Sequence, residues 1–422
     1  MESIEAHAGE SLIERVAGID VGKAEVVCCV RVPDAARRGH RGQEVRRFST
    51  MTAALHQMCD WFAELSVQRV VMESTSDYWR PPFYVLEARG FEPWLVNARE
   101  VKHLPGRPKT DRIDAVWLAK LAERQMLRPS FVLPPDLREL RELTRYRVDL
   151  VVMRNSEKQR VEKVLEDAQI KVSLVASDPF GVSGRAIMAA LIAGERDPER
   201  LADLARGVLR KKTPDLVEAL TGRFNQQHAW LLAKMLQRVD DHDRDIADVD
   251  ARIEELLAPF AEAVAVLDQI PGIDRVAAAA VIGEIGVDMS RFPTAGHLCS
   301  WAGFAPLAHA SAGREKKRKT GHGSRYLARA MGNAAAGAAR TQTHLGQRQR
   351  ELARRRGKDV ANVATGRAIL VAVWHLLSEP SGHFNDLGPQ WREHKRSPRG
   401  QARRYVRQLQ ALGFNVTITP AA

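Results

Sequence analysis

Residues 15–31 read RVAGIDVGKAEVVCCVR, a stretch dominated by β-branched and other apolar residues. This composition is typical of a buried strand. The motif Gly-Ile-Asp-Val-Gly at residues 18–22 interrupts the stretch, and its glycines open space for a ligand beside Asp20. The stretch therefore predicts the first strand of a sheet, with a candidate site residue on it.

The segments that follow alternate between strand and helix patterns. Short apolar runs predict strands, and apolar residues at helical spacing predict helices. Strands are expected at residues 44–49, 68–72 and 91–96, and helices at 51–65, 77–88 and 111–127. The order β-β-α-β-α-β-α favours an α/β domain with a mixed sheet. Because Pro134 and Pro135 mark a boundary, we assign this domain to residues 1–133.

The middle of the chain, residues 134–264, is predicted to be helical. Long charged helical patterns cover about 136–170 and 214–262, and the stretch around 173–184 is loop-like. Long charged helices joined by a loop indicate a helical hairpin or a coiled coil. Such a rod could dimerise the protein, hold nucleic acid or act as a spacer.

The third region, residues 265–380, is predicted to be mainly α-helical, with helices at about 324–340 and 362–377. It opens with Ile-Pro-Gly-Ile at 270–273 and a helix of small residues, which resembles a helix-hairpin-helix element. A glycine turn of that kind lets backbone N–H groups approach a phosphate. Tight helix packing alone is the alternative explanation for the alanines. A basic tail, residues 381–422, follows.

Composition and charge limit the function. The 422 residues suggest two or three domains, and 64 Lys and Arg against 52 Asp and Glu give a net charge of +12. Such a chain usually meets a polyanion, and nucleic acid is favoured over membrane because no basic amphipathic anchor stands out. An arginine-rich genome is the alternative explanation of the charge.

Targeting and redox features are also informative. No apolar run approaches the roughly 18–20 residues of a membrane span, and the richest stretch, Val276–Ile282, is short. The acidic N-terminus is unlike a signal peptide. The four cysteines form no CxxC pair, so neither a disulfide framework nor a zinc module is expected. We expect a cytoplasmic protein without a membrane partner.

Four carboxylates form the strongest candidate site. Asp20 lies in the first strand, Glu73 ends a buried strand, and Asp111 and Asp114 are three residues apart and so share one helix face. Four carboxylates brought together repel each other unless hard divalent cations neutralise them, and oxygen ligands favour Mg²⁺ or Mn²⁺. The alternative is purely structural, since Asp111 could cap its own helix.

The acidic motifs lie at residues 18–23 (GIDVGK), 71–78 (VMESTSDY) and 109–115 (KTDRIDA). In this order they resemble the three motifs of the DEDD transposases of the IS110 family, relatives of the Piv/MooV DNA invertases. Residues 270–340 are similar to the second conserved domain of that family, with Ser-Trp-Ala-Gly at 300–303 and Ser-Ala-Gly at 311–313. The resemblance covers about residues 15–130 and 265–378.

This resemblance implies an RNase H-like (RuvC-like) N-terminal domain whose four carboxylates bind Mg²⁺, for which Mn²⁺ can substitute. It also implies a C-terminal transposase domain with a catalytic serine, which is Ser311 by motif match. Together they would form a covalent 5′-phosphoserine link to DNA, guided by a bridge RNA. Ser300 is the second candidate, although its neighbour Trp301 suggests a packed position. The family's usual lysine after Ser-Ala-Gly is Arg314 here.

The expected partners are donor and target DNA, a non-coding guide RNA and further copies of the chain in a homodimer or homotetramer, at the bacterial nucleoid. Basic residues beside the motifs are candidates for nucleic-acid contacts. They are Arg107, Lys109, Arg314, Lys316, Lys317, Arg318, Lys319 and Arg325.

Three other functions stay open from sequence. One is a hydrolytic, metal-dependent nuclease of the Holliday-junction type, which would tolerate Ser311→Ala. Another is a site-specific DNA invertase. The third is a non-catalytic nucleic-acid-binding protein, for which Asp20→Ala would leave binding unchanged.

Overall fold

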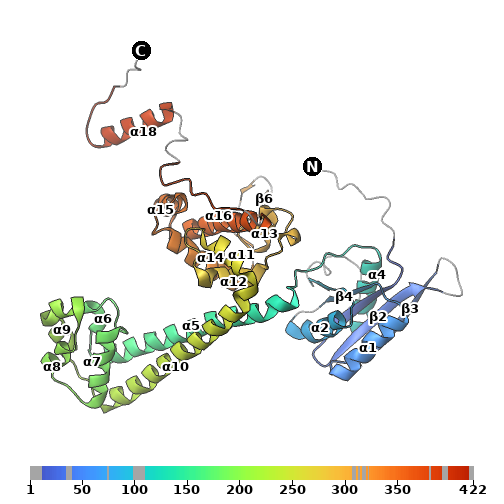
Figure 1. Ribbon diagram of the computed structural model, residues 1–422, viewed down its shortest axis with the longest axis horizontal. Helices are drawn as coiled ribbons and strands as arrows, with labels where there is room; N and C mark the ends of the chain where they lie inside the picture. Colours follow the sequence, from blue (N-terminus) through green and yellow to red (C-terminus); the bar gives the residue numbers. More distant parts are fainter. Residues whose placement is uncertain are drawn as a thin grey trace. The chain divides into compact units, whose positions relative to one another are not determined.

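The computed structural model describes residues 12–34, 40–73, 76–97, 110–306, 310–311, 314–315, 320–321, 323–379, 382–391 and 398–417. The chain divides into two compact units, residues 1–132 and 133–422 (Figure 1). The finer division into ranges 134–264, 265–380 and 381–422 stays a prediction.

The first unit contains a mixed sheet, as predicted, with five strands where four were expected. Its strands are β1 (Val16–Val21), β2 (Glu25–Pro33), β3 (Arg41–Ser49), β4 (Arg69–Glu73) and β5 (Pro93–Val96). The strand order is β3-β2-β1-β4-β5. Strand β2 runs antiparallel to both β1 and β3, whereas β4 is parallel to both β1 and β5. The sheet therefore combines a meander with crossover strands.

The single strand expected at 15–31 is wrong, because this stretch forms both β1 and β2. The chain reverses at residues 22–24, where the Gly22 N–H donates to the Glu25 carbonyl oxygen at 3.0 Å. One apolar run can supply two strands because each of them is largely buried. A turn this short leaves little polar sequence to mark it.

Helices cover both faces of the sheet. On one face, α1 (Thr52–Glu64) and α2 (Arg80–Ala88) pack on alternate residues such as Ala17 and Ile19. On the other face, α4 (Asp111–Glu123) packs on Val16 and Val71. A short 3₁₀ helix, η1, precedes α2 at Asp77–Trp79. The period of two along β1 and β4 thus decides which side chains meet α4.

The second unit begins with a long helix pair. Helix α5 (Pro135–Asp167) and helix α10 (Gln226–Leu257) lie side by side (Figure 1). Arg147 pairs with Asp250, and Arg154 pairs with Asp243 at 2.6 Å, so seven residues up α5 correspond to seven residues down α10. The two helices are antiparallel, which confirms the predicted helical hairpin. At 1.5 Å per residue each is about 48 Å long.

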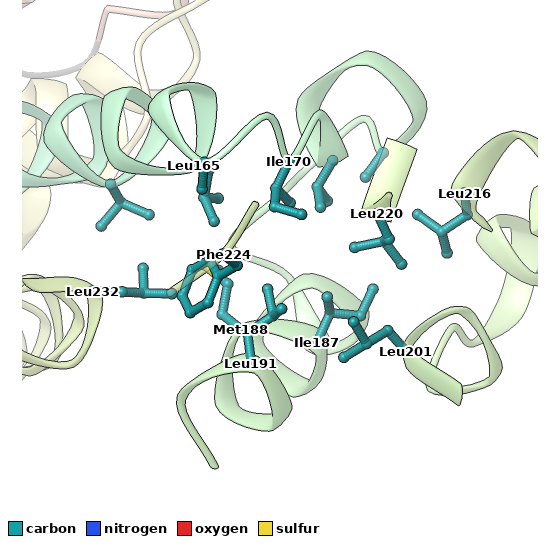
Figure 2. Packing of buried hydrophobic residues seen from close by; sticks show 14 of the residues in the cluster. Leu165, Ile170, Ile187, Met188, Leu191, Leu201, Leu216, Leu220, Phe224 and Leu232 are labelled. Carbon is teal, nitrogen blue, oxygen red and sulfur yellow. The ribbon is translucent and has the colours of Figure 1, made fainter. Parts of the chain in front are cut away.

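The connection between these helices is not the predicted loop. Helices α6 (Val172–Val175), α7 (Val182–Ala193), α8 (Pro198–Asp203) and α9 (Thr213–Leu220), with the 3₁₀ helix η2 (Gly207–Lys212), form a small bundle. Its own apolar core includes Ile187, Leu191 and Leu220 (Figure 2). The continuous helix expected over 214–262 is wrong, because it breaks before Asn225. Asn225 caps α10 by accepting from the His228 N–H at 3.0 Å.

The remaining helices pack together at one end of the long pair, where α12 contacts α5. They are η3 (Ala258–Phe260), α11 (Ala261–Asp268), α12 (Arg275–Ile285), η4 (Met289–Arg291), α13 (Ala295–Trp301), α14 (Arg325–Ala338), α15 (His344–Arg356) and α16 (Lys358–Ser378). Two short strands, β6 (Ala310–Ser311) and β7 (Arg314–Glu315), lie between α13 and α14. Helix α18 (Pro398–Ala411) lies in the tail.

Helix α16 corrects the expectation that no segment reaches the length of a membrane span. By length and composition alone its 21 residues suffice to cross a membrane. Its side chains Ile369, Leu370 and Val373 are fully buried, and it packs on α13, α14 and α15. The apolar composition of α16 is therefore explained in part by its packing on these helices, whereas Val360 and Val363 near its start are exposed.

Candidate active site

Asp20 and Glu73 are brought together by the register of the sheet. In the parallel pair of β1 and β4 they are opposite residues, at the carboxyl ends of both strands. Both lie on the face that α4 covers, because they alternate with residues of the opposite core. Glu73 is only 8% exposed and Asp20 is half-buried. The carboxyl edge of parallel strands is where α/β proteins commonly bind ligands.

Helix α4 brings two more carboxylates towards this edge. The Ile13 N–H, just before β1, donates to the carbonyl oxygen of Glu123 at the last turn of α4, at 3.0 Å. The helix therefore runs antiparallel to β1. Its first turn, with Asp111 and Asp114, lies towards the strand end that carries Asp20.

The close approach of α4 to the sheet depends on Gly18. A Cβ atom at this position would lie 2.4 Å from the Ala119 nitrogen and 2.5 Å from the Ala115 oxygen, both in the backbone of α4. No side chain fits at such distances, so Gly18 serves helix packing. The expectation that this glycine opens space for a ligand is wrong, because α4 fills that space. Asp20 is two residues further along the same face of β1.

The first turn of α4 is capped by Thr110. Its Oγ1 accepts a hydrogen bond from the Ile113 N–H at 3.3 Å. The alternative that Asp111 caps its own helix is therefore wrong. Asp111 is exposed and Asp114 is half-buried. Both carboxylates lie in the first turn of α4.

The structure brings the four carboxylates to one edge without closing them into a ligand cluster. Across the described ranges, no three Asp, Glu, His or Cys side chains lie close enough together to hold an ion as they stand. Carboxylates that share an edge repel each other. Their chemistry fits a hard divalent cation, because every donor is a carboxylate oxygen.

In the second unit, Ser311 lies near the closed end of a β-hairpin. Strands β6 and β7 are antiparallel, with Ala310 opposite Glu315 and Ser311 opposite Arg314. An isolated antiparallel bridge joins Pro306 to Thr320 further down. The backbone of Ser311 therefore belongs to the last described pair before the chain reverses.

The base of this hairpin is held by a close backbone approach. Gly303 has φ +76°, and a Cβ atom there would lie 2.8 Å from the Gly321 oxygen. A Cβ atom on Gly323 would lie 2.2 Å from the Ala302 oxygen. The residues before and after the hairpin are thus in direct backbone contact, and only glycine permits this.

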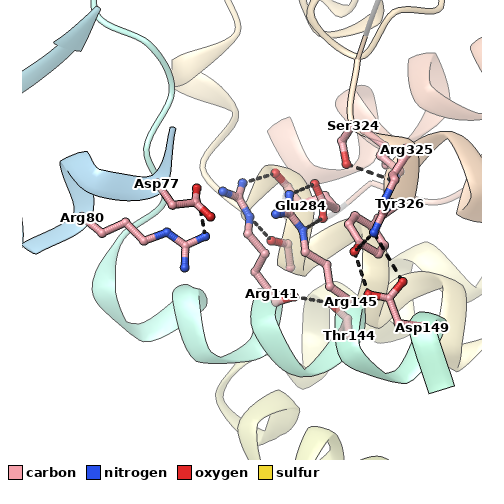
Figure 3. A network of polar contacts seen from close by, with 12 residues as sticks. Asp77, Arg80, Arg141, Thr144, Arg145, Asp149, Glu284, Ser324, Arg325 and Tyr326 are labelled. Carbon is pink, nitrogen blue, oxygen red and sulfur yellow. Dashed lines mark hydrogen bonds and ion pairs between the residues drawn. The ribbon is translucent and has the colours of Figure 1, made fainter. Parts of the chain in front are cut away.

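Behind the hairpin, the start of α14 is fixed to α5. Ser324 caps α14 by accepting from the Leu327 N–H at 3.4 Å. The Tyr326 hydroxyl donates to Asp149 Oδ2 at 2.9 Å, and the Arg145 guanidinium lies 5.0 Å from the centre of the Tyr326 ring (Figure 3). This contact holds the helix start that directly follows the hairpin.

Arg145 is itself held by a buried carboxylate of α12. Glu284 is 1% exposed and accepts from Arg145 Nε at 2.6 Å and Nη2 at 3.0 Å (Figure 3). The neighbouring Arg141 donates to the carbonyl oxygens of Gly283 and Glu284 at 3.0 and 2.8 Å. A bidentate pair of this kind fixes both the distance and the orientation of two helices.

Arg325 also belongs to this polar network, through an ion pair and a hydrogen bond. It is exposed, lies 3.5 Å from Asp149, and donates to the Tyr326 hydroxyl at 2.5 Å. That hydrogen bond raises the pKa of Arg325 above its ordinary value. Of the other predicted nucleic-acid contacts, Arg314 lies in β7. Arg107, Lys109, Lys316, Lys317, Arg318 and Lys319 lie outside the described residues.

Two expectations about the transposase-like motifs need correction or refinement. Ser300 is exposed on α13, so the packed position suggested by Trp301 is wrong.

Gly272, in the predicted phosphate-binding turn, has φ +94°. A Cβ atom there would lie 2.0 Å from the Ala334 oxygen of α14. The described backbone therefore supports the packing explanation for this turn.

Comparison with known proteins identifies the family. A model of DEDD transposases of the IS110 type, described as a transposase, matches residues 17–170. A second model, described as "Transposase IS116/IS110/IS902 family", matches residues 264–350. The chain belongs to the IS110 family of DEDD transposases. This IS110 transposase is thus an enzyme that acts on DNA.

A curated relative and a solved structure resemble the transposase. It is 28% identical over 321 residues to the "Insertion element IS900 uncharacterized 42 kDa protein" of Mycobacterium paratuberculosis. That match covers 69% of the transposase and 77% of the relative. The Thermus thermophilus RuvC structure matches 28% of the transposase and 99% of its own chain, with 13% identity and a TM-score of 0.22.

Sequence reasoning missed the residues that support the transposase site. Thr110 could have been found, because a threonine directly before a helical pattern is a common cap. No local sequence pattern indicated the polar network of the second unit, which consists of Tyr326, Asp149, Arg145 and Glu284. Tyr326 is 177 residues from Asp149, and Arg145 is 139 residues from Glu284.

Proposed function

We propose that the transposase cuts and rejoins DNA through a 5′-phosphoserine intermediate. Asp20, Glu73, Asp111 and Asp114 hold the metal, and Ser311 is the nucleophile. The observation that carries this proposal is the pairing of Asp20 with Glu73 at the edge towards which α4 directs its first turn. Paired carboxylates on neighbouring parallel strands suit phosphodiester chemistry that depends on divalent cations.

The first unit is proposed to be an RNase H-like catalytic domain. The support is the strand order β3-β2-β1-β4-β5, with β2 antiparallel and β4 parallel to β1. The acidic residues also occur at the expected places, on the central strand, on its parallel neighbour and on the helix that covers them.

The proposed reaction consists of two successive transesterifications. In the first, the Ser311 hydroxyl oxygen attacks the phosphorus, the bond from phosphorus to the 3′ oxygen breaks, and the serine proton ends on the departing 3′ hydroxyl. In the second, a 3′ hydroxyl of the other strand attacks the same phosphorus and releases the serine. The number of phosphodiester bonds is conserved, so no nucleotide cofactor is needed.

The carboxylates and the hairpin have different tasks in this scheme. When bound, Mg²⁺ or Mn²⁺ lowers the effective pKa of a hydroxyl and stabilises charge that develops on the phosphate. The carboxylates would hold the metal ion at the edge of the sheet. The hairpin carries Ser311, while Asp149 and Arg145 hold the start of α14, the helix that follows the hairpin, through Tyr326. Arg314 and Arg325 contribute positive charge for the phosphate.

Further aspects extend this proposal. The DNA substrates are a donor and a target, and a bridge RNA supplies sequence choice, as the family resemblance suggests. Two strands must be exchanged, so a homodimer or homotetramer at the bacterial nucleoid is the working assembly. Transposition rather than inversion is the proposed outcome, supported by the transposase descriptions of both matching family models.

A covalent-adduct assay tests the proposal. The gene is expressed with its native flanks so that any guide RNA is present, and labelled donor and target DNA are supplied with Mg²⁺. After denaturation, DNA that remains on the protein is measured for the wild type, Ser311→Ala and Asp111→Ala. Ser300→Ala is the matched control, because this exposed serine lies in the neighbouring helix α13.

The expected result is an adduct in the wild type and in Ser300→Ala that disappears in the other two variants. Cleavage without an adduct that persists in Ser311→Ala would support the hydrolytic nuclease and overturn the serine mechanism. An adduct in Ser311→Ala that disappears in Ser300→Ala would move the nucleophile to α13.

A further inference from the structure

A strongly basic turn joins α15 to α16. Residues 354–358 read RRRGK, so four of five successive residues are cations. We call Arg354, Arg355, Arg356 and Lys358 the basic turn. All four are exposed. The turn starts four residues beyond the region matched by the second family model, which ends at residue 350.

The cations of the basic turn are not used to hold the fold. Among the described residues, none of the four side chains has an ion pair or hydrogen-bond partner. By contrast, Arg350, one turn earlier in α15, donates to the carbonyl oxygens of Ala339 and Thr341 at 2.7 and 2.8 Å. Asp359 is the one acidic residue in the sequence from 354 to 378.

Helix electrostatics explain only part of this arrangement. Three arginines at the carboxyl end of α15 stabilise its dipole. Gly357, with φ +88°, then ends α15 and begins α16 without a side-chain cap. Lys358 is the first residue of α16, where the positive end of the dipole disfavours a cation. The basic turn therefore concentrates more positive potential than folding alone would favour.

The same surface continues along α16. Val360 is 54% exposed and Val363 is 39% exposed, and Arg367 is exposed as well. These residues are three and four positions apart, so they form one stripe on the helix. Aliphatic side chains between cations suit contact with a sugar–phosphate backbone, in which charged and apolar groups alternate.

We propose that the basic turn and the first turns of α16 bind the phosphate backbone of duplex DNA, outside the active site. The inference rests on the proposed function, since it assigns to this surface the DNA on which the transposase acts. Three arginines and a lysine supply the charge, and the uncapped N–H groups of α16 add donors for a phosphate. This contact does not depend on the DNA sequence. It raises the affinity of the transposase for duplex DNA and orients the duplex on the protein.

The test compares two triple variants in duplex-DNA binding over about 50–200 mM salt. R354Q/R355Q/R356Q removes three cations of the basic turn. The control R200Q/R244Q/R252Q removes three arginines that are also exposed but are ion-paired on other helices. Both variants lose the same net charge. Thermal melting of each variant checks that the fold is kept.

The plot of log K against log salt has a negative slope. If each arginine contacts one phosphate, R354Q/R355Q/R356Q makes this slope less steep by about 2.7, at about 0.9 per contact. The control leaves the slope unchanged, and R354K/R355K/R356K restores it. Equal slopes for both glutamine variants would overturn the proposal. A reduced slope for guide RNA with an unchanged slope for duplex DNA would also overturn it, in favour of an RNA surface.

The same measurement in a Ser311→Ala background separates this inference from the proposed function. The slope difference persists there, because it measures binding and not chemistry. If the transposase with an intact Ser311 forms no covalent adduct but the slope difference is present, the result would count against the phosphoserine mechanism alone. A missing slope difference in a transposase that forms the adduct would count against the basic turn alone.

Discussion

Asp20 of β1 and Glu73 of β4 are opposite residues in a parallel strand pair, and both face α4. Strands about 4.8 Å apart place two carboxylates near each other at the edge of the sheet. Two carboxylates at neighbouring positions repel each other when both are ionised. A cation that binds both carboxylates converts this repulsion into affinity, which is the property expected of a catalytic metal site.

Asp20→Asn should separate metal binding from folding. Without divalent ions, the variant should melt at or above the wild-type temperature, because one of the two repelling charges is gone. With Mg²⁺ the wild-type Tm should rise, by about 4 °C for each 1 kcal/mol of binding linkage, whereas the variant should barely respond. Differential scanning fluorimetry with and without Mg²⁺ measures both effects.

The matched control is Asp60→Asn, whose carboxylate pairs with Arg89 and lies on α1, on the opposite side of the sheet. This variant should keep the full response to Mg²⁺. If Asp20→Asn and the wild type gain the same Tm from Mg²⁺, the carboxylate edge does not bind the ion.

Gly18→Ala should push α4 away from the sheet. The new methyl group would meet backbone atoms of Ala115 and Ala119, which cannot rotate aside. We expect a loss of about 2 kcal/mol in unfolding free energy, typical of overpacking, and weaker binding of divalent ions as Asp111 and Asp114 move. Urea denaturation and the Mg²⁺-dependent Tm measure the two effects.

Gly42→Ala serves as the control, because its Cβ would meet atoms no closer than 3.7 Å, an ordinary contact. It lies in β3 of the same sheet. Equal stability of the two variants would show that α4 tolerates a side chain at Gly18.

Glu284→Gln should weaken the core of the second unit. The change leaves Arg145 without its bidentate partner in a buried setting, and loss of one partner of a buried ion pair costs roughly 3 kcal/mol. Glu254→Gln, which breaks the exposed pair with Arg275, should cost far less. Urea denaturation compares the two variants, and similar losses would contradict the structural role of Glu284.

Tyr326→Phe should affect adduct formation more than stability. The ring still lies under Arg145, but the hydroxyl that binds Asp149 is gone. Because α14 starts directly after the hairpin, a looser start should lower the yield of DNA adduct several-fold while Tm falls little. Quantified adducts and thermal melts test this, and an unchanged adduct yield would separate the network from Ser311.

Alkaline pH should destabilise the first unit through its buried thiols. Burial raises the pKa of Cys29 and of Cys59 from 9.0 to about 11. Between these values an unfolded chain releases protons that the folded domain retains, so stability falls as pH rises from about 9 to 11. Urea midpoints at pH 8 and pH 10.5 should differ less in Cys29→Ala/Cys59→Ala than in the wild type. Identical pH dependence in both proteins would show that other groups cause the loss.

Much of the site was predictable because local chemistry specifies it. The motif around Asp20, the strand that ends at Glu73 and the helix with Asp111 and Asp114 each carry a short-range pattern. The turn at residues 22–24 was missed because an unbroken apolar run hides a strand reversal. The bundle formed by α6–α9 was missed because short helices with proline and glycine starts resemble loops.

Short-range patterns were enough to predict the acidic motifs, the α/β class of the first unit and the helical character of the rest. These follow from side-chain chemistry and from periods of 2 and 3.6 residues. Only the tertiary structure decided that Asp20 lies opposite Glu73, that α4 runs antiparallel to β1, and that Tyr326 binds Asp149. Register, direction and contacts between distant residues depend on how elements pack, and that packing is a property of the whole chain.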